Sequence, residues 1–199
     1  MKRSLLFALA AIVVMQFSGF SQSMGKGKSV FYVGIGAWHG YGSVKYRGYG
    51  YTNTSTPTLH LGFERGVSEA IPQSIIGLGG HLSVWAGHSS YRDGRGHGWN
   101  SNWTNMTALF KGFYHHKFLV GEKWDVYAAI AAGIRYQAYN YSYTDAEYSS
   151  DQYAYAAVAP AIGVSIGGRY YVGKTFGFYA EVGQGWNVDY AQVGFAFKF

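Results

Sequence analysis

The stretch "VGFAFKF", residues 193–199, stands at the end of the sequence. Its large apolar side chains occupy every second position, and these are Val193, Phe195, Phe197 and Phe199. Strict alternation is typical of a β-strand with one apolar face, because successive side chains of a strand point to opposite faces. A soluble protein rarely carries so apolar a strand up to a final aromatic ring, since chain termini usually fray into water. The stretch therefore raises the question of what covers the apolar face.

The composition favours one folded domain rich in β-structure. The chain has 199 residues, a usual length for a single domain. Aromatic residues make up 19% and charged residues 13%, the latter about half the usual share. This balance excludes intrinsic disorder, which requires many charges and few aromatic residues. The mean hydropathy of −0.08 is too polar for a helical membrane protein and suits a barrel that is apolar outside and polar inside.

Other stretches alternate in the same way, and no helical period of useful length accompanies them. In residues 58–65, for example, Leu59, Leu61 and Phe63 share one parity, while the other parity is small or polar. Each stretch has one apolar face and one face that mixes glycine, polar and aromatic residues, so we expect about eight strands. Their approximate ranges are 30–39, 58–65, 75–88, 103–118, 126–139, 153–171, 176–187 and 193–199.

The connections between these stretches alternate in length. The long connections are residues 40–56, 89–102 and 140–151, and the short ones are 67–74, 119–125, 172–175 and a tight turn near 187–189. Long loops at one end and short turns at the other are typical of transmembrane barrels, with the short turns periplasmic and the long loops extracellular. The sequence therefore predicts an all-β fold, an eight-stranded antiparallel up-and-down transmembrane β-barrel.

Barrel size indicates which face points outward. In an eight-stranded barrel the lumen is just wide enough for side chains to fill, so the glycine and polar parity belongs inside. The apolar parity then faces lipid, where barrel closure satisfies every backbone N–H and C=O group. We expect two lipid-facing aromatic belts, one near the short turns and one near the long loops. The first contains Phe31, Phe63, Phe176, Phe178, Phe197 and Phe199, and the second contains Trp186 and Tyr136.

Residues 1–21 have the features of a secretory signal peptide. Two basic residues precede an apolar run, "LLFALAAIVVM" at 5–15, and small residues follow it. We expect cleavage before Gln22, with cleavage before Met24 as the alternative, which leaves residues 22–199 as the barrel domain. A retained membrane anchor is less favoured, because the run is shorter than the roughly 20 residues of a spanning helix.

Cysteine content and net charge exclude several kinds of function. The chain has no cysteine, which excludes disulfides, thiol catalysis and cysteine metal sites. Loss of Lys2 and Arg3 with the signal peptide would reduce the formal net charge from +6 to +4. That surplus suits an anionic lipid surface but is too small to favour nucleic acid as a partner.

The most specific part of the sequence is "GFYAEVGQGWNVDYAQVGFAFKF", residues 177–199. With the alternating pattern from about residue 30 onward, it resembles the small eight-stranded outer-membrane β-barrels of Gram-negative bacteria, the OmpA/OmpX-like family. In that family the last strand closes the barrel against the first and ends on an aromatic residue, with apolar residues at every second position before it. The matching positions here are Ala191, Val193, Phe195, Phe197 and Phe199.

The resemblance implies a location in the bacterial outer membrane with both termini in the periplasm. It further implies that the matching positions form an assembly signal, read by the outer-membrane insertion machinery. Outer-membrane lipids, that machinery and periplasmic chaperones are then the expected partners, and no cofactor is expected. We see no peptidoglycan-binding domain after the last strand, which disfavours a wall-tethering role. The loops match no member of the family, and its members differ in function mainly through their loops.

Charged residues on the inward parity form the first candidate site. A charge in a narrow lumen must pair or stay hydrated, because desolvating it alone costs several kcal/mol. We expect a structural network of ion pairs, with a switchable gate in a narrow channel as the alternative. The pairing depends on strand register, which the sequence leaves open. The residues are Glu64, Lys111, Arg135, Arg169, Glu181 and Lys198.

Histidines invite a metal or catalytic interpretation, which we do not favour. His81 and His115 share the inward parity and could be cross-strand neighbours, but no carboxylate at a suitable depth is evident. Histidine, serine and aspartate are common in any loop, so their presence near residues 88–97 is weak evidence for a hydrolase triad. We therefore expect no metal-binding and no catalytic residue. The residues of the triad type are His88, Ser89, Ser90, Asp93 and His97.

The sequence thus predicts a non-enzymatic outer-membrane protein that supports envelope integrity, or surface recognition and adhesion through its long loops. Two loop stretches, "YGSVKYRGYGY" at 41–51 and "YRDGRGHGW" at 91–99, have a composition that suits anionic lipid sugars or host glycans. A narrow pore for ions or small solutes is the first alternative. A lipid-modifying barrel enzyme and a soluble barrel that binds an apolar ligand are less favoured.

Overall fold

The computed structural model describes residues 23–37, 46–48, 50–144, 152–186, 188 and 191–199. The expected signal peptide lies outside these residues and stays a prediction. The strands are β1 (Ser29–Ala37), β2 (Tyr46–Gly48), β3 (Tyr51–Ser55), β4 (Thr58–Ser68), β5 (Ser74–Arg92), β6 (Gly98–Val120), β7 (Trp124–Tyr143), β8 (Tyr153–Tyr171), β9 (Phe176–Trp186) and β10 (Ala191–Lys198). Among the described residues, no helix has the length and apolarity needed to cross a membrane.

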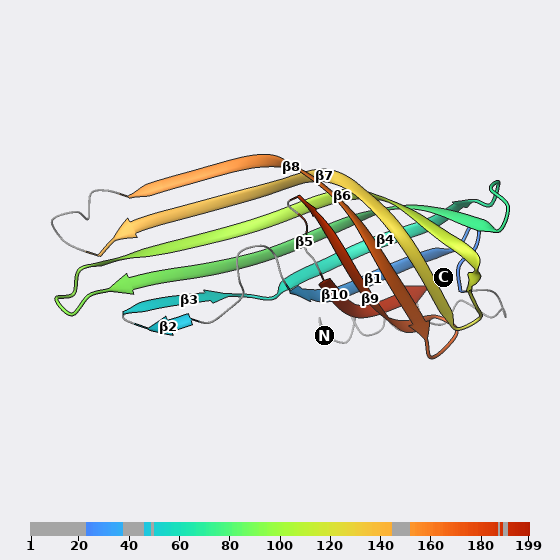
Figure 1. Ribbon diagram of the computed structural model, residues 1–199, viewed down its shortest axis with the longest axis horizontal. Helices are drawn as coiled ribbons and strands as arrows, with labels where there is room; N and C mark the ends of the chain where they lie inside the picture. The colour runs from blue at the N-terminus through green and yellow to red at the C-terminus, as the bar shows by residue number, and fades with distance from the viewer. Residues whose placement is uncertain (1–22, 38–45, 49, 145–151, 187, 189–190) are drawn as a thin grey trace, which may run out of the picture.

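Eight of the strands close into an antiparallel barrel (Figure 1). Around the ring the order is β5, β4, β1, β10, β9, β8, β7 and β6, and pairing of β6 with β5 completes it. The last strand closes against the first, with Phe197 opposite Phe31 and Phe195 opposite Val33. The predicted fold class, an eight-stranded antiparallel up-and-down barrel, is confirmed.

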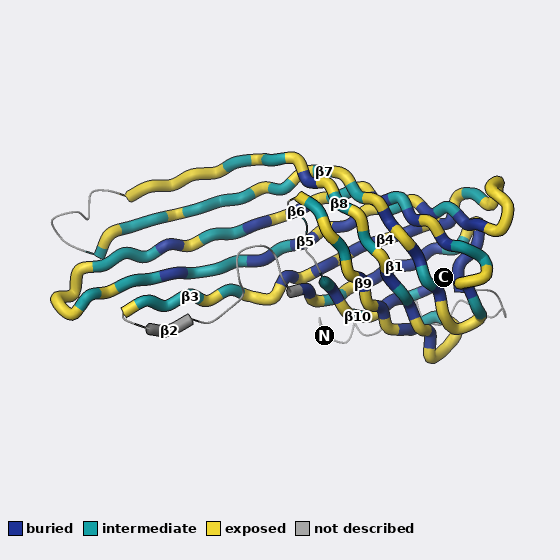
Figure 2. The backbone as a smooth tube through the Cα atoms, viewed as in Figure 1, coloured by how far each residue is buried: buried dark blue, intermediate teal, exposed yellow. Residues whose placement is uncertain are grey.

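The outward parity of the barrel strands is apolar. Ile130, Val164 and Ile166 expose 68%, 60% and 62% of their surface, far more than a water-facing wall of large aliphatic residues would tolerate. Figure 2 shows exposed positions alternating with buried or half-buried ones along the barrel strands. Aromatic rings gather at the short-turn end, where Phe176 lies 5.5 Å from the ring of Phe197. This exterior matches the lipid-facing parity that the sequence predicts.

Strands β5 to β8 continue far past the barrel as an open sheet, which extends to the left in Figure 1. Residues 51–55 of β3 pair with the outer part of β5, and β2 pairs with β3. On the other side, β9 pairs with β8 only from Ile162 onward, so residues 153–161 of β8 pair with β7 alone. We call this open sheet the extension: β2, β3 and residues 85–92, 98–105, 137–143 and 153–161.

The extension corrects the prediction of long loops. Residues 89–92 and 98–102 belong to β5 and β6, residues 140–143 to β7, and the 40–56 segment contains β2 and β3. The serines, asparagines and glycines of these segments resemble loop composition, but cross-strand pairing keeps the backbone extended. Only a short turn separates β5 from β6, where Asp93 Oδ1 accepts the backbone N–H groups of Arg95 and His97 at 2.8 and 2.9 Å.

A proline separates β3 from β4. Pro57 has no backbone N–H to donate to a neighbouring strand, and the β-structure is interrupted there, between Ser55 and Thr58. Thr56 bridges the break, because its Oγ1 donates to the Ala86 carbonyl at 3.2 Å and accepts the Ala86 N–H at 3.0 Å. Strand β3 therefore continues the edge that β4 begins, along the same neighbour β5.

Candidate functional site

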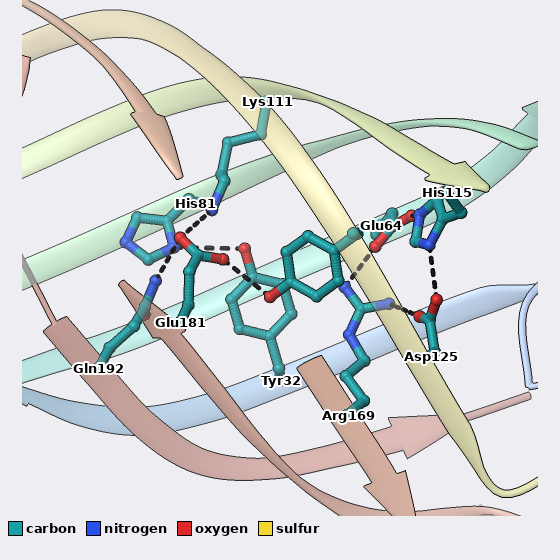
Figure 3. Close-up of polar contacts among 10 residues, drawn as sticks. Tyr32, Glu64, His81, Lys111, His115, Asp125, Arg169, Glu181 and Gln192 are labelled. Atoms are coloured by element: carbon teal, nitrogen blue, oxygen red, sulfur yellow. Dashed lines mark hydrogen bonds and ion pairs between the residues drawn. The ribbon is translucent and has the colours of Figure 1, made fainter. Parts of the chain in front are cut away.

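The half of the lumen nearest the short turns contains a closed ring of ion pairs (Figure 3). Glu64 of β4 accepts hydrogen bonds from His115 of β6, at 2.6 Å, and from Arg169 of β8. Asp125 of β7 accepts from the same two residues, at 2.7 Å and 3.1 Å. Both ring nitrogens of His115 thus face carboxylate oxygens, and a doubly protonated ring satisfies both. The ring then contains two cations and two anions and is electrically neutral.

Aromatic rings surround the guanidinium group of Arg169. Its carbon lies 4.4 Å from the centre of the Tyr127 ring and 5.8 Å from that of Phe113. Such cation–π contacts are favourable, more so away from water. The Tyr127 ring in turn lies where a Cβ at residue 167 would be, so Gly167 is needed to admit it. The buried cation is therefore held by carboxylates at its edge and by rings at its faces.

A second network lies deeper in the lumen, around Glu181 of β9. Lys111 Nζ donates to Glu181 Oε1 at 2.6 Å, and Gln192 Nε2 donates to the same oxygen at 2.8 Å. The hydroxyl of Tyr127 donates to Oε2 at 2.8 Å. The carboxylate is buried but has three donors, which offsets the cost of removing it from water.

Three further residues form a short chain beside this network. His60 Nδ1 lies 3.1 Å from His81 Nε2, and His81 Nδ1 lies 3.3 Å from the hydroxyl of Tyr32. These residues come from β4, β5 and β1. The two networks and this chain together take side chains from every strand of the barrel ring and so cross-link the wall through its interior.

The other two predicted lumen charges lie apart from these networks. Arg135 lies toward the extension, where its Nε and Nη2 donate to Asn105 Oδ1 at 2.9 and 2.6 Å and its guanidinium lies over Trp85. Lys198 lies at the short-turn end, with its Nζ 4.6 Å from the centre of the Tyr171 ring. The structure therefore pairs Glu64 with Arg169 and Lys111 with Glu181, and it gives Arg135 and Lys198 other neighbours.

We call the closed ring of ion pairs formed by Glu64, His115, Asp125 and Arg169 the lower ring. Sequence reasoning missed two of its members. Asp125 was expected in a short turn, but β7 begins at Trp124 and carries it inward. His115 was expected to lack a carboxylate, yet it has two. His81 is opposite Leu109 rather than beside His115, so those two histidines are not cross-strand neighbours. Extending the predicted strand 126–139 by one residue toward its N-terminus would have placed Asp125 on the inward face. The contacts across the lumen could not be found in this way, because they depend on barrel closure.

Side chains fill most of the lumen between the two networks. The space left beside His60, His81, Glu181 and Gln192 measures about 30 Å³, which is room for roughly one or two water molecules. At the short-turn end, Met24 is fully buried in an apolar cluster, and Ser23 donates its N–H and its Oγ to the carbonyls of Gly121 and Trp124.

Three of the residues considered for a hydrolase triad have other partners in the structure. His88 Nδ1 lies 2.8 Å from Asn102 Oδ1, and Asp93 is engaged in its own turn. Ser89 donates to Asn53. Among the residues that the structure describes, no group of three or more His, Asp or Glu side chains is arranged so that it could hold a metal ion.

Polarity reverses along β5, β6 and β7 where they leave the barrel. On the outward parity of β7, Ile130 and Ile134 lie in the barrel and Asn140 in the extension. Strands β5 and β6 change in the same way, from Leu82 to Ser90 and from Phe110 to Asn100. The register between these strands runs without a shift from residues 74–92 through 98–115 to 127–143. The reversal is therefore a change of side chains and not a change of face.

The inward parity of the extension carries aromatic side chains, where the lumen has charges. Register sets them in rows across the sheet: Tyr51, Tyr91, Trp99 and Tyr143 in one row, and Gly87, Trp103, Tyr139 and Tyr155 in another. Between them runs a row of Asn53, Ser89, Ser101, Tyr141 and Tyr153. We call this surface the aromatic face. These side chains are on the same parity as the lumen-facing residues of the barrel. The aromatic rings therefore lie on one side of the sheet only.

Comparison with known proteins identifies neighbours in fold. No protein-family model matches the chain, and no curated protein matches it. Ail, the attachment invasion locus protein of Yersinia pestis, is 9% identical, with 88% of this chain and 100% of Ail covered and a TM-score of 0.45. A structure of Ail in complex with the heparin analogue sucrose octasulfate is 10% identical, with the same 88% and 100% coverage and a TM-score of 0.47.

The N-terminal β-barrel domain of Pseudomonas aeruginosa OprF is also similar. It is 13% identical, covers 90% of this chain and 100% of its own length, and has a TM-score of 0.38. Ail and the OprF domain are small outer-membrane barrels of the OmpA/OmpX-like type. The predicted fold class is confirmed by the closed ring of eight antiparallel strands itself.

Proposed function

We propose that this protein is a non-enzymatic outer-membrane barrel that recognises ligands outside the cell with its extension. The reversal of polarity along β5 to β7 carries the proposal. Lipid covers an aliphatic outer wall, whereas polar residues such as Asn140 face water. A sheet that leaves the membrane and then turns its aromatic residues to one side is suited to binding rather than to spanning.

In this proposal the barrel anchors the extension in the membrane, and the ion pairs of the lumen stabilise the barrel. Conduction would require a path through the lumen, which means breaking the Lys111–Glu181 ion pair and the ion pairs of the lower ring. Breaking either set leaves buried charges without partners, which is costly. The pore alternative is therefore less favoured than a closed wall. Cross-linking of all ring strands also favours a second role, support of envelope integrity, since a stiff barrel resists deformation with the surrounding membrane.

Topology is tested by labelling single cysteines, because the natural chain has none. We expect Asn140→Cys to react with a membrane-impermeant maleimide on intact cells and Glu122→Cys, in the β6–β7 turn, to react only after the outer membrane is permeabilised. Ile130→Cys should resist labelling in both states. Labelling of Glu122→Cys but not Asn140→Cys on intact cells would reverse the orientation and remove the proposal.

Function is tested by shortening the extension. In the variant, residues 88–102 are replaced by a two-residue turn and residues 140–154 by another, so that the barrel part of each strand is kept. Adhesion of cells to immobilised polysaccharides and matrix proteins is measured beside their survival in detergent. Loss of adhesion with unchanged survival supports recognition. Loss of survival with unchanged adhesion contradicts it and supports the envelope role.

A further inference from the structure

We propose that the aromatic face binds a neutral oligosaccharide, in a cavity between β3, β5, β6 and β7. This inference rests on the proposed function, because it requires the extension to lie outside the cell. The cavity has a volume of about 390 Å³, within the roughly 300–1,000 Å³ of small-ligand sites. Its lining residues are Tyr51, Trp85, Ser89, Trp99, Ser101, Trp103, Gln137 and Tyr139.

Aromatic rings of the cavity are fixed by their neighbours before any ligand arrives. The Trp99 indole stacks on Tyr141 at 5.6 Å and 26°, and Tyr51 meets Trp99 edge-on at 5.9 Å and 66°. These are favoured geometries for aromatic pairs. Trp103 lies against Gly87, where a Cβ would overlap its indole. Such ring orientation lowers the entropic cost of binding, since few rotamers remain to be lost.

Hydroxyl and amide groups lie between the aromatic rows. Ser89 and Ser101 face each other across β5 and β6, and Ser89 Oγ donates to Asn53 Oδ1 at 3.2 Å. Gln137 also lines the cavity and supplies an amide group. A ligand edge rich in hydroxyl groups can exchange hydrogen bonds with these side chains, which an apolar ligand cannot do.

This alternation matches the surface of a sugar. A pyranose ring has one or both faces lined by C–H groups, which pack on the negative face of an aromatic ring, and an edge of hydroxyl groups that donate and accept. None of the eight lining residues carries a formal charge. The guanidinium of Arg135 lies over the lining residue Trp85 and donates to Asn105 Oδ1. The site therefore favours a neutral saccharide over a sulfated or otherwise anionic one.

Isothermal titration calorimetry with the full barrel in detergent tests the inference. The probes are the hexasaccharides of maltose, cellobiose and chitobiose type, with heparin as the anionic comparison. We expect at least one neutral probe to bind more tightly than heparin. Trp99→Ala should weaken that binding at least tenfold, and Trp99→Phe, which keeps a ring, should weaken it less. Asn140→Ala, on the opposite side of the extension, is the control and should leave the affinity unchanged.

Two results overturn the inference. One is that none of the neutral probes binds, and the other is that Trp99→Ala and Asn140→Ala change the affinity equally. Heat-modifiable migration on a denaturing gel, measured for each variant, separates loss of binding from loss of the folded barrel. Either result leaves the proposed function intact if shortening the extension still abolishes adhesion. If adhesion survives the shortening, the proposed function fails independently of the sugar.

Discussion

The barrel and the extension are built from the same strands and solve opposite problems. In the barrel, β5 to β7 turn aliphatic residues outward, and β6 and β7 turn charged residues such as Lys111 and Asp125 inward. In the extension the same parities turn amides and hydroxyls outward and aromatic rings inward. The register does not shift between the two regions. The difference in side chains therefore reflects what surrounds each region, lipid around the barrel and water around the extension. The boundary of the membrane can thus be located on the chain itself.

The barrel and the extension also differ in the side chains that fill the inner face of the sheet. Charges can fill the lumen because the closed wall lets residues of distant strands meet across the axis, as Arg169 of β8 reaches Glu64 of β4. An open sheet has no opposite wall. Its inward residues must stay stable beside water, and aromatic residues with a polar group at the tip, such as Tyr139 and Trp103, are suited to that.

Closure of the barrel carries the largest expected effect. We propose that the carboxyl-terminal strand is the assembly signal of the barrel, and its last residue closes the seam: Phe199 N–H donates to Ser29 at 3.0 Å and its ring lies 6.4 Å from that of Phe63. Phe199→Asp should reduce the heat-modifiable fraction in the membrane several-fold while total export is unchanged. Phe199→Tyr, which keeps an aromatic ring, is the control. An equal heat-modifiable fraction for Phe199→Asp and the natural chain would refute the signal.

The lower ring of ion pairs is the next test, since it exists only where the wall is closed. Arg169→Met leaves the carboxylates of Glu64 and Asp125 buried beside a single histidine. We expect the free energy of unfolding in urea, measured in lipid vesicles, to fall by about 3–5 kcal/mol. Lys117→Met removes an exposed pair with Glu69 and should cost about 1 kcal/mol or less. Equal losses for the two variants would mean that the ring is not a structural element.

Matched substitutions on the outward face of β7 test the boundary itself. Ile130→Lys places a cation against lipid and should cost about 2–4 kcal/mol. Asn140→Lys makes the same change on the same parity in the extension and should change stability by about 0.5 kcal/mol or less. Both are measured by urea unfolding in vesicles. A similar cost at the two positions would show that the boundary lies elsewhere along the strand.

The smallest expected effect concerns Glu69, in the turn after β4. Its carboxylate accepts the backbone N–H of Lys26 at 2.8 Å and the Nζ of Lys117 at 2.9 Å. These contacts, the Lys26 hydrogen bond first, lower the pKa of Glu69 from its ordinary value of 4.5. A lowered pKa in the folded state means that the contacts stabilise the protein fully above that value and less as the pH falls through the lowered one.

Hydrogen exchange of residues 23–28 reports on those contacts. Protection should be constant between pH 7 and pH 5, after correction for intrinsic exchange, and decrease below the ordinary pKa. Glu69→Gln should show weaker protection at pH 7 and little further change on acidification. If the natural chain and Glu69→Gln lose protection in parallel, another group is responsible.

The sequence predicted the parts of this fold that depend on alternation alone. Strand number and parity follow from a period of two that local sequence already contains. Closure of the last strand, with Phe195 and Phe197, against the first was implied by the resemblance to the small outer-membrane barrels. The extension was missed because Ser89, Ser101 and Asn100 resemble loop residues, and only their partners on neighbouring strands keep them extended. The inward charges were found by parity, but the link from Glu64 through His115 to Asp125 depends on closure of residues far apart in sequence.

The unbroken register between barrel and extension has a mechanical consequence. Strand β6 has 23 residues, a length of about 75 Å at 3.3 Å per residue. A pull on anything attached to the aromatic face runs parallel to β5, β6 and β7 and loads their hydrogen bonds in shear, many at once rather than one after another. The same strands end beside the ion pairs of the lumen. The molecule would therefore resist unfolding most strongly when force acts along the strands, which is the direction in which an attached surface pulls.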